Sequence, residues 1–180
     1  MNKYIKVNNE ISLTDVREGD QPSLVKYLND EDIAANTLLI PYPYTQADGD
    51  FFINLCRENE VKHGHLVNWA IRNTEGVMIG GIGRIMKSDM GSQHKDEIGY
   101  WMAKPYRGKG LTTEVVKVFT EYWFQNSSVI RIEAVIFPHN KASQRVVEKA
   151  GFEREAYCKK YHIKKGVPID GIMYVRFKEE

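Results

Sequence analysis

Cysteine is scarce in this sequence. Its two cysteines, Cys56 and Cys158, are far apart and form no Cys-x-x-Cys pair. This spacing excludes a disulfide framework and a cysteine-based zinc site, and it indicates two reduced thiols in a cytosolic protein. The five histidines show no His-Glu-x-x-His or other ligand spacing. We therefore expect no metal cofactor.

The chain also lacks an excess of charge, because 25 Lys and Arg residues stand against 24 Asp and Glu residues. This balance excludes a chain-wide basic field for nucleic acid, and the lysines at 159, 160, 164 and 165 fit a solvated hairpin better. No run approaches the ~18 apolar residues of a membrane span, and residues 1–10 contain no apolar leader. We expect a cytoplasmic protein, a monomer or homodimer, with no membrane or nucleic-acid partner.

The remaining composition is that of an ordinary globular protein, with 42% hydrophobic and 27% charged residues. A chain of 180 residues lies within the usual range for one domain. At that size, folding buries roughly 70% of the unfolded surface, so the core needs no disulfide or metal. The expected organisation is a single domain over residues 1–180.

Apolar periodicity and turn residues divide the chain into helices and strands. Thr45 is a predicted N-cap of one helix, and Asp20 or Ser23 is the predicted cap of a shorter helix before it. Further helices are predicted over 33–39, from 111 onwards and over 140–150. Strands are predicted over 11–16, 65–72, 77–86, 97–103, 131–137, 156–163 and 169–177, with a surface loop over 87–95.

Two of the later helices carry specific expectations. The helix after Gly110 has an apolar stripe at helical spacing, formed by Leu111, Val115, Val118, Phe119, Tyr122 and Trp123. In the helix over 140–150 we expect Ala142, Val146 and Ala150 to face inward. Gly151 is then a left-handed stop, followed by a buried Phe152. The element order predicts a mixed α/β (α+β) fold, with a mostly antiparallel sheet of six to seven strands flanked by helices.

The most informative stretch is residues 97–114, a predicted strand followed by a basic glycine turn and an amphipathic helix. Such a turn places backbone N–H groups and the positive end of a helix dipole together, which suits a phosphate-bearing ligand. The turn is not a Walker loop, because no Gly-Lys-Ser/Thr follows. The glycines at 80, 81 and 83 lie inside a predicted strand and indicate close packing instead.

Three ordered motifs strengthen this interpretation. They are the stretch from Glu97 to Gly110, Asn140-Lys141-Ala142-Ser143 at the start of a helix, and Ala150-Gly151-Phe152 at its end. Together they resemble the GNAT superfamily of acetyl-CoA-dependent N-acetyltransferases, and within it the branch of ribosomal-protein N-terminal acetyltransferases. The segment from Ile40 to Thr45 is also similar to that branch. The likeness covers nearly the whole chain and implies a GNAT fold with a splayed strand pair at the cofactor site.

The resemblance assigns the binding of acetyl-CoA as cosubstrate to particular residues. The family pattern Arg/Gln-x-x-Gly-x-Gly/Ala falls on Arg107, Gly110 and Thr112, where Thr112 departs from the expected small residue. It implies that the strand edge at Trp101, Met102 and Ala103 pairs with pantetheine, and that Asn140 binds it from the other side. The implied diphosphate ligands are the backbone amides of Arg107, Gly108, Lys109, Gly110, Leu111 and Thr112.

The chemistry of acetyl transfer suggests two catalytic residues. An amine attacks a thioester only when neutral, so a base must accept a proton, and Glu97 is the candidate. A backbone N–H near Met102 is the candidate donor to the oxyanion. Ser143 is the candidate partner of the departing thiolate, because Val147 replaces the tyrosine that many family members carry. The alternatives are an exposed Glu97 paired with a nearby lysine, and a Ser143 that only caps its helix.

The acceptor stays open at this point. By resemblance we prefer a protein or peptide N-terminal amine. A small amine, such as a polyamine, an amino-sugar antibiotic or an amino acid, is the alternative substrate. A non-catalytic acyl-CoA-binding module is the alternative from another class. Tyr42 and Tyr44 are expected partly in the core and partly in an acceptor channel, whereas Trp69 is expected in the core.

Overall fold

A computed structural model of the chain describes residues 3–85 and 93–179. By their contacts the residues form two compact units. The first unit is Met1–Gly83 with Tyr100–Leu111, and the second is Arg84–Gly99 with Thr112–Glu180. A single domain over 1–180 stays a prediction. The predicted surface loop over 87–95 lies largely outside the described residues, and Lys95 already belongs to a strand.

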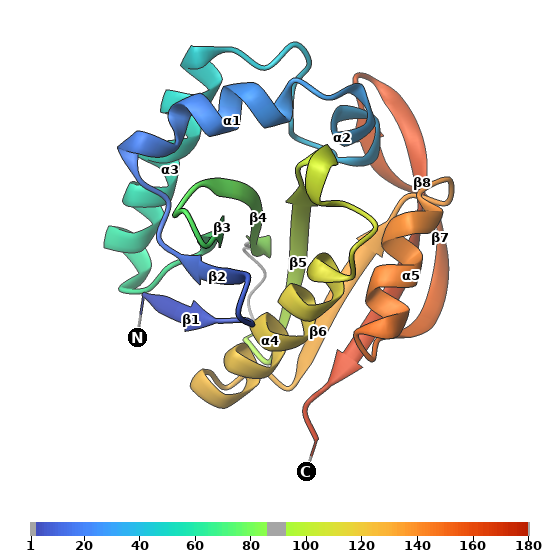
Figure 1. Ribbon diagram of the computed structural model, residues 1–180. Coiled ribbons are helices and arrows are strands. Elements are labelled where there is room, and N and C mark those ends of the chain that lie inside the picture. The colour runs from blue at the N-terminus through green and yellow to red at the C-terminus, as the bar shows by residue number, and fades with distance from the viewer. Residues whose placement is uncertain (1–2, 86–92, 180) are drawn as a thin grey trace. The chain divides into compact units, whose positions relative to one another are not determined.

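The first unit combines antiparallel strands with helices (Figure 1). Its strands follow the order β1-β2-β3-β4, with the end of β5 beside β4. Helices α1 and α3 pack against each other in this unit. The elements are β1 (Tyr4–Lys6), β2 (Ile11–Thr14), η1 (Glu18–Asp20), α1 (Gln21–Leu28), α2 (Glu31–Asn36), α3 (Gln46–His63), β3 (Asn68–Asn73), β4 (Met78–Ile85), β5 (Lys95–Met102) and η2 (Lys104–Tyr106).

The second unit continues from the first half of β5, with the strand order β5-β6-β8-β7. Strands β5 and β6 are parallel, whereas β6 with β8 and β8 with β7 are antiparallel. The fold is therefore mixed α/β with a mostly antiparallel set of eight strands, one more than expected. The elements of this unit are α4 (Leu111–Asn126), β6 (Arg131–Ile136), α5 (Lys141–Lys149), β7 (Glu153–Lys164) and β8 (Val167–Phe177).

Several local predictions are confirmed. The Thr45 side chain accepts a hydrogen bond from the Asp48 N–H and begins α3, and the Asp48 carboxylate bonds back in a capping box. Gly151 has a φ of 87°, and Phe152 after it is 3% exposed. The buried positions of α4 include Leu111, Val115, Phe119 and Trp123 of the predicted stripe. Val118 and Tyr122 of that stripe are half-buried, and the buried positions Val116, Thr120 and Phe124 were not part of it, so the pattern identified the inward face in part.

Three local predictions are wrong, each for a physical reason. On α5, Ala142 is exposed and Gln144 is buried instead, because its amide donates to the carbonyls of Phe137 and Pro138. Asp20 stands before α1 but makes no side-chain cap, since its carboxylate binds Arg72. Strand β1 was missed because it has three residues and no apolar alternation.

Candidate functional site

The predicted phosphate turn is a short, exposed loop between β5 and α4. The Ala103 N–H donates to Ile79 O at 2.9 Å and ties the end of β5 to β4. Strand β5 is followed by η2, and α4 begins at Leu111, directly after Gly110. Gly108 and Gly110 have φ angles of 77° and 82°, a left-handed conformation that glycine adopts without strain. The two glycines therefore set the path of the loop into the helix.

Space lies open around these glycines. Apart from its chain neighbours, a Cβ atom on Gly108 or Gly110 would meet nothing within 4 Å. Gly108, Lys109 and Gly110 are exposed, Leu111 is buried, and Thr112 is half-buried in the first turn of α4. The first four N–H groups of an α-helix have no partner within the helix, and they attract anions. The loop is thus an arrangement that can bind an anion.

The three residues predicted to pair with pantetheine, Trp101, Met102 and Ala103, do not all face the same edge of β5. Successive backbone groups of a strand point to opposite edges, and the Ala103 N–H points to β4. The backbone groups of Trp101 also point to β4, whereas those of Met102 face the other edge. The β5–β6 ladder comprises Lys95–Glu97 with Arg131–Glu133, so Met102 lies beyond it. Of the three predicted residues, Met102 alone directs its backbone N–H and C=O away from β4.

The glycines of β4 make room for the end of β5. A Cβ on Gly80 would lie 2.7 Å from Trp101 O, and one on Gly81 would lie 2.7 Å from Trp101 Nε1. Trp101 and Met102 are buried at 9% and 5% exposure. A side chain on either glycine would thus clash with Trp101, which supports the interpretation of the glycine cluster as close packing.

Arg107 is directed into the protein. Its backbone N–H donates to Lys104 O at 3.3 Å, and its Nε donates to Met102 O at 2.8 Å. Its Nη2 donates to the Asp30 carboxylate at 2.7 Å. The amides that remain as candidates for the diphosphate are therefore those of residues 108–112.

Helix α5 begins with the predicted asparagine. Asn140 Oδ1 accepts a hydrogen bond from the Ser143 N–H at 3.0 Å, which makes Asn140 the cap of the helix. The N-cap residue of α5 is therefore Asn140, and Ser143 stands three residues after it. Ser143 is half-buried in the first turn of α5.

Glu97 is buried, contrary to the alternative of an exposed strand residue. It is 4% exposed, and its neighbour across the parallel β5–β6 ladder is Glu133, which is also 4% exposed. Arg131 Nε donates to Glu133 at 2.8 Å, and Glu155 also binds the Arg131 guanidinium. These hydrogen bonds raise the pKa of Arg131, with the larger effect from Glu155. Two carboxylates and a firmly charged arginine thus lie on one pair of strands.

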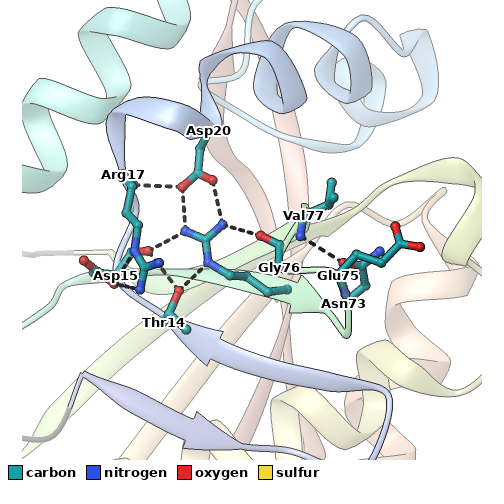
Figure 2. A network of polar contacts seen from close by, with 9 residues as sticks. Thr14, Asp15, Arg17, Asp20, Asn73, Glu75, Gly76 and Val77 are labelled. Atoms are coloured by element: carbon teal, nitrogen blue, oxygen red, sulfur yellow. Dashed lines mark hydrogen bonds and ion pairs between the residues drawn. The ribbon is translucent and has the colours of Figure 1, made fainter.

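A buried ion pair that the sequence did not reveal lies in the first unit (Figure 2). Arg72 donates from Nη1 to Asp20 at 2.6 Å and to Gly76 O at 3.1 Å. Its Nη2 donates to Asp20 at 2.8 Å and to Asp15 O at 2.9 Å, and its Nε donates to Thr14 Oγ1 at 2.6 Å. These acceptors match all five N–H groups of a guanidinium, so the network is structural.

A cavity of about 440 Å³ in the first unit is lined by acidic and basic side chains, among them Asp15, Glu18 and Arg57. Cys56 lines it, and burial raises the pKa of its thiol to about 12, so this sulfur is not a nucleophile at neutral pH.

Among the described residues, no group of three His, Cys, Asp or Glu side chains is placed to hold a metal ion. None of the helices in that part of the chain is long and apolar enough to cross a bilayer.

Comparison with known proteins extends these observations. The probable N-acetyltransferase YjcK of Bacillus subtilis (strain 168) is 41% identical over 75 residues, which cover 42% of this chain and 39% of that protein. The ribosomal protein uS5-alanine N-acetyltransferase of Escherichia coli (strain K12) is 30% identical over 100 residues, covering 56% of this chain and 52% of that protein. The chain spans between 39% and 60% of the lengths of the first curated relatives that it matches.

A solved structure supports the same fold. The microcin C7 self immunity acetyltransferase MccE, in complex with acetyl-CoA and AMP, superposes with a TM-score of 0.86. It is 20% identical, and the match covers 99% of this chain and 98% of that one. The family model of the acetyltransferase (GNAT) domain matches residues 10–153, most of the chain. With the strand, glycine loop and helix described above, this match shows that the chain belongs to the GNAT acetyltransferase family.

Proposed function

We propose that this protein is an acetyl-CoA-dependent N-acetyltransferase that transfers acetyl directly to a primary amine. The observation that carries the proposal is the open loop between β5 and α4. Gly108 and Gly110 are left-handed there, and a Cβ on either would meet open space. MccE, which shares the fold, was solved with acetyl-CoA.

The cosubstrate would contact four parts of the chain. The backbone amides of Gly108, Lys109, Gly110, Leu111 and Thr112 would hold the diphosphate at the start of α4. The Met102 C=O, on the edge of β5 away from β4, would accept a hydrogen bond from pantetheine beside the one from Arg107 Nε, and the Met102 N–H would stay available for the oxyanion. Asn140 uses its Oδ1 as a helix cap, so its Nδ2 group would donate to pantetheine. Ser143 would lie near the sulfur.

The chain's own residues would then divide the chemistry. Glu97 would accept the proton that the amine loses, directly or through water. As the N–C bond forms, the Met102 N–H would donate to the oxyanion. When the C–S bond breaks, the Ser143 hydroxyl would hydrogen-bond to the thiolate.

For the acceptor we propose a protein or peptide N-terminal amine. The support is the relative named for acetylation of an alanine of ribosomal protein uS5, which aligns with 56% of this chain. A small amine is the alternative substrate. A module that binds acyl-CoA without turnover is the alternative from another class.

Release of the free CoA thiol tests this function. The assay supplies acetyl-CoA with a panel of N-terminal peptides, polyamines, amino sugars and amino acids, and we expect turnover with peptides. Glu97→Gln should lower turnover and shift its pH profile, and Ser143→Ala should lower turnover more than CoA affinity. Turnover with small amines alone would replace the proposed acceptor. CoA binding without release for every amine would leave only the binding module.

A further inference from the structure

The Arg107 side chain connects the glycine loop to the start of α2, within the first unit. Its Nη2 lies 2.7 Å from Asp30 Oδ2, and its Nε donates to Met102 O at 2.8 Å. Its Nη1 lies 3.7 Å from the exposed Asp32 carboxylate. The Asp30 side chain is only 14% exposed, and the Arg107 side chain is 33% exposed. The charge-assisted bond to Asp30 is thus the stronger of the two carboxylate contacts.

Asp30 uses its two carboxylate oxygens for different purposes. Its Oδ1 accepts the Asp32 N–H at 2.9 Å and caps α2, whereas its Oδ2 accepts from Arg107. The residue before Asp30 is fixed by two hydrogen bonds, because Asn29 donates to Tyr44 O at 2.7 Å and accepts the Tyr44 N–H at 2.9 Å. Tyr44 is buried at 5% exposure. Asp30 therefore holds Arg107 from a fixed position.

We propose that Asp30 is a positioning residue of the cofactor site. Through Arg107 it holds the loop of residues 104–110 in the conformation that receives the diphosphate. This inference rests on the proposed function, and it adds a residue outside the glycine motif. A loop already held in its binding conformation loses less entropy when the ligand binds. The Asp30–Arg107 contact, which we call the brace, therefore strengthens CoA affinity without touching the ligand.

A rival role for Arg107 predicts the opposite result. If the Arg107 guanidinium were itself a ligand of the diphosphate, Asp30 would compete with the phosphate for it. Removing the negative charge of Asp30 would then tighten CoA binding, as would the simple loss of repulsion between Asp30 and the phosphates. If Asp30 instead positions Arg107, removing the charge of Asp30 loosens the loop and weakens CoA binding. Whether CoA affinity rises or falls when the charge of Asp30 is removed therefore distinguishes the two roles.

The test compares Asp30→Asn with Asp32→Asn. An asparagine caps a helix about as well as an aspartate, so Asp30→Asn keeps α2 while removing the charge that holds Arg107. Asp32→Asn removes a charge of the same sign from an exposed neighbour. By calorimetry we expect Asp30→Asn to weaken CoA binding about fivefold to twentyfold, and Asp32→Asn less than about twofold.

Hydrogen exchange of the ligand-free protein provides a second readout. Asp30→Asn should speed exchange in residues 104–111 while the exchange of α2 and the melting temperature change little. Unchanged or tighter CoA binding by Asp30→Asn would overturn the inference, as would unchanged exchange of the loop. A wild-type protein that does not bind CoA would overturn the proposed function as well, so the two failures are distinguishable.

Discussion

Two arginines of the first unit, Arg72 and Arg107, each bind an aspartate and at least one backbone carbonyl, but their surroundings differ. Arg72 is 6% exposed, and five acceptors satisfy its guanidinium (Figure 2). The Arg107 side chain is 33% exposed and lies beside a loop whose glycines face open space. Both pairs bring together residues distant in the sequence, 52 positions apart for Arg72 and 77 for Arg107.

The difference separates a contribution to stability from a contribution to shape. A buried charge that loses its partner is costly, so the loss of either Arg72 or Asp20 would lower the stability of the fold. A partly exposed pair is worth little to stability, because water and salt screen it. The Arg107 pair therefore has its main effect on the loop that it holds.

Asp20→Ala tests the buried pair. It leaves the Arg72 guanidinium without its carboxylate, and we expect it to lower the free energy of unfolding by about 3–5 kcal/mol. Asp30→Asn should lower it by less than about 1 kcal/mol, since the helix cap remains and the Arg107 pair is partly exposed. Urea unfolding followed by circular dichroism measures both. Equal losses in the two variants would remove the distinction between the arginines.

Thr14→Val tests the same network at a single hydrogen bond. Valine matches the shape of threonine but removes the oxygen that accepts the Arg72 Nε–H at 2.6 Å. One buried donor then lacks its acceptor, and we expect a loss of about 1–3 kcal/mol. Thr14→Ser, which keeps the hydroxyl, should recover part of that loss. A Thr14→Val variant as stable as the wild type would show that the network tolerates an unpaired donor.

Much of the fold was predictable because its signals are local. The apolar spacing of α4, the Thr45 capping box and the left-handed Gly151 each depend on a few neighbouring residues. The glycine loop was found for the same reason, since a strand, two glycines and a helix follow one another directly. Strand β1 has three residues and no apolar alternation, and so it carried no such signal.

The rest depends on contacts between distant residues. Asp20 resembles a helix cap in the sequence, but Arg72 binds its carboxylate from 52 positions away. The contact between Asp30 and Arg107 could not be predicted from the sequence either, because Asp30 lies 77 positions before Arg107. The buried face of α5 was misjudged because Gln144 satisfies its amide with two carbonyls, which makes burial of a polar side chain favourable.

CoA binding to Gly110→Glu and Gly166→Glu tests the central claim most directly. Both glycines are left-handed, with φ angles of 82° and 79°, and a Cβ on either meets open space, so both variants suffer similar backbone strain. Only Gly110 lies at the proposed diphosphate site. By calorimetry we expect Gly110→Glu to lose at least about 100-fold in affinity, because a side chain and a negative charge would occupy that site. Gly166→Glu should bind like the wild type. Equal affinity in the wild type and both variants would contradict the assignment of the loop.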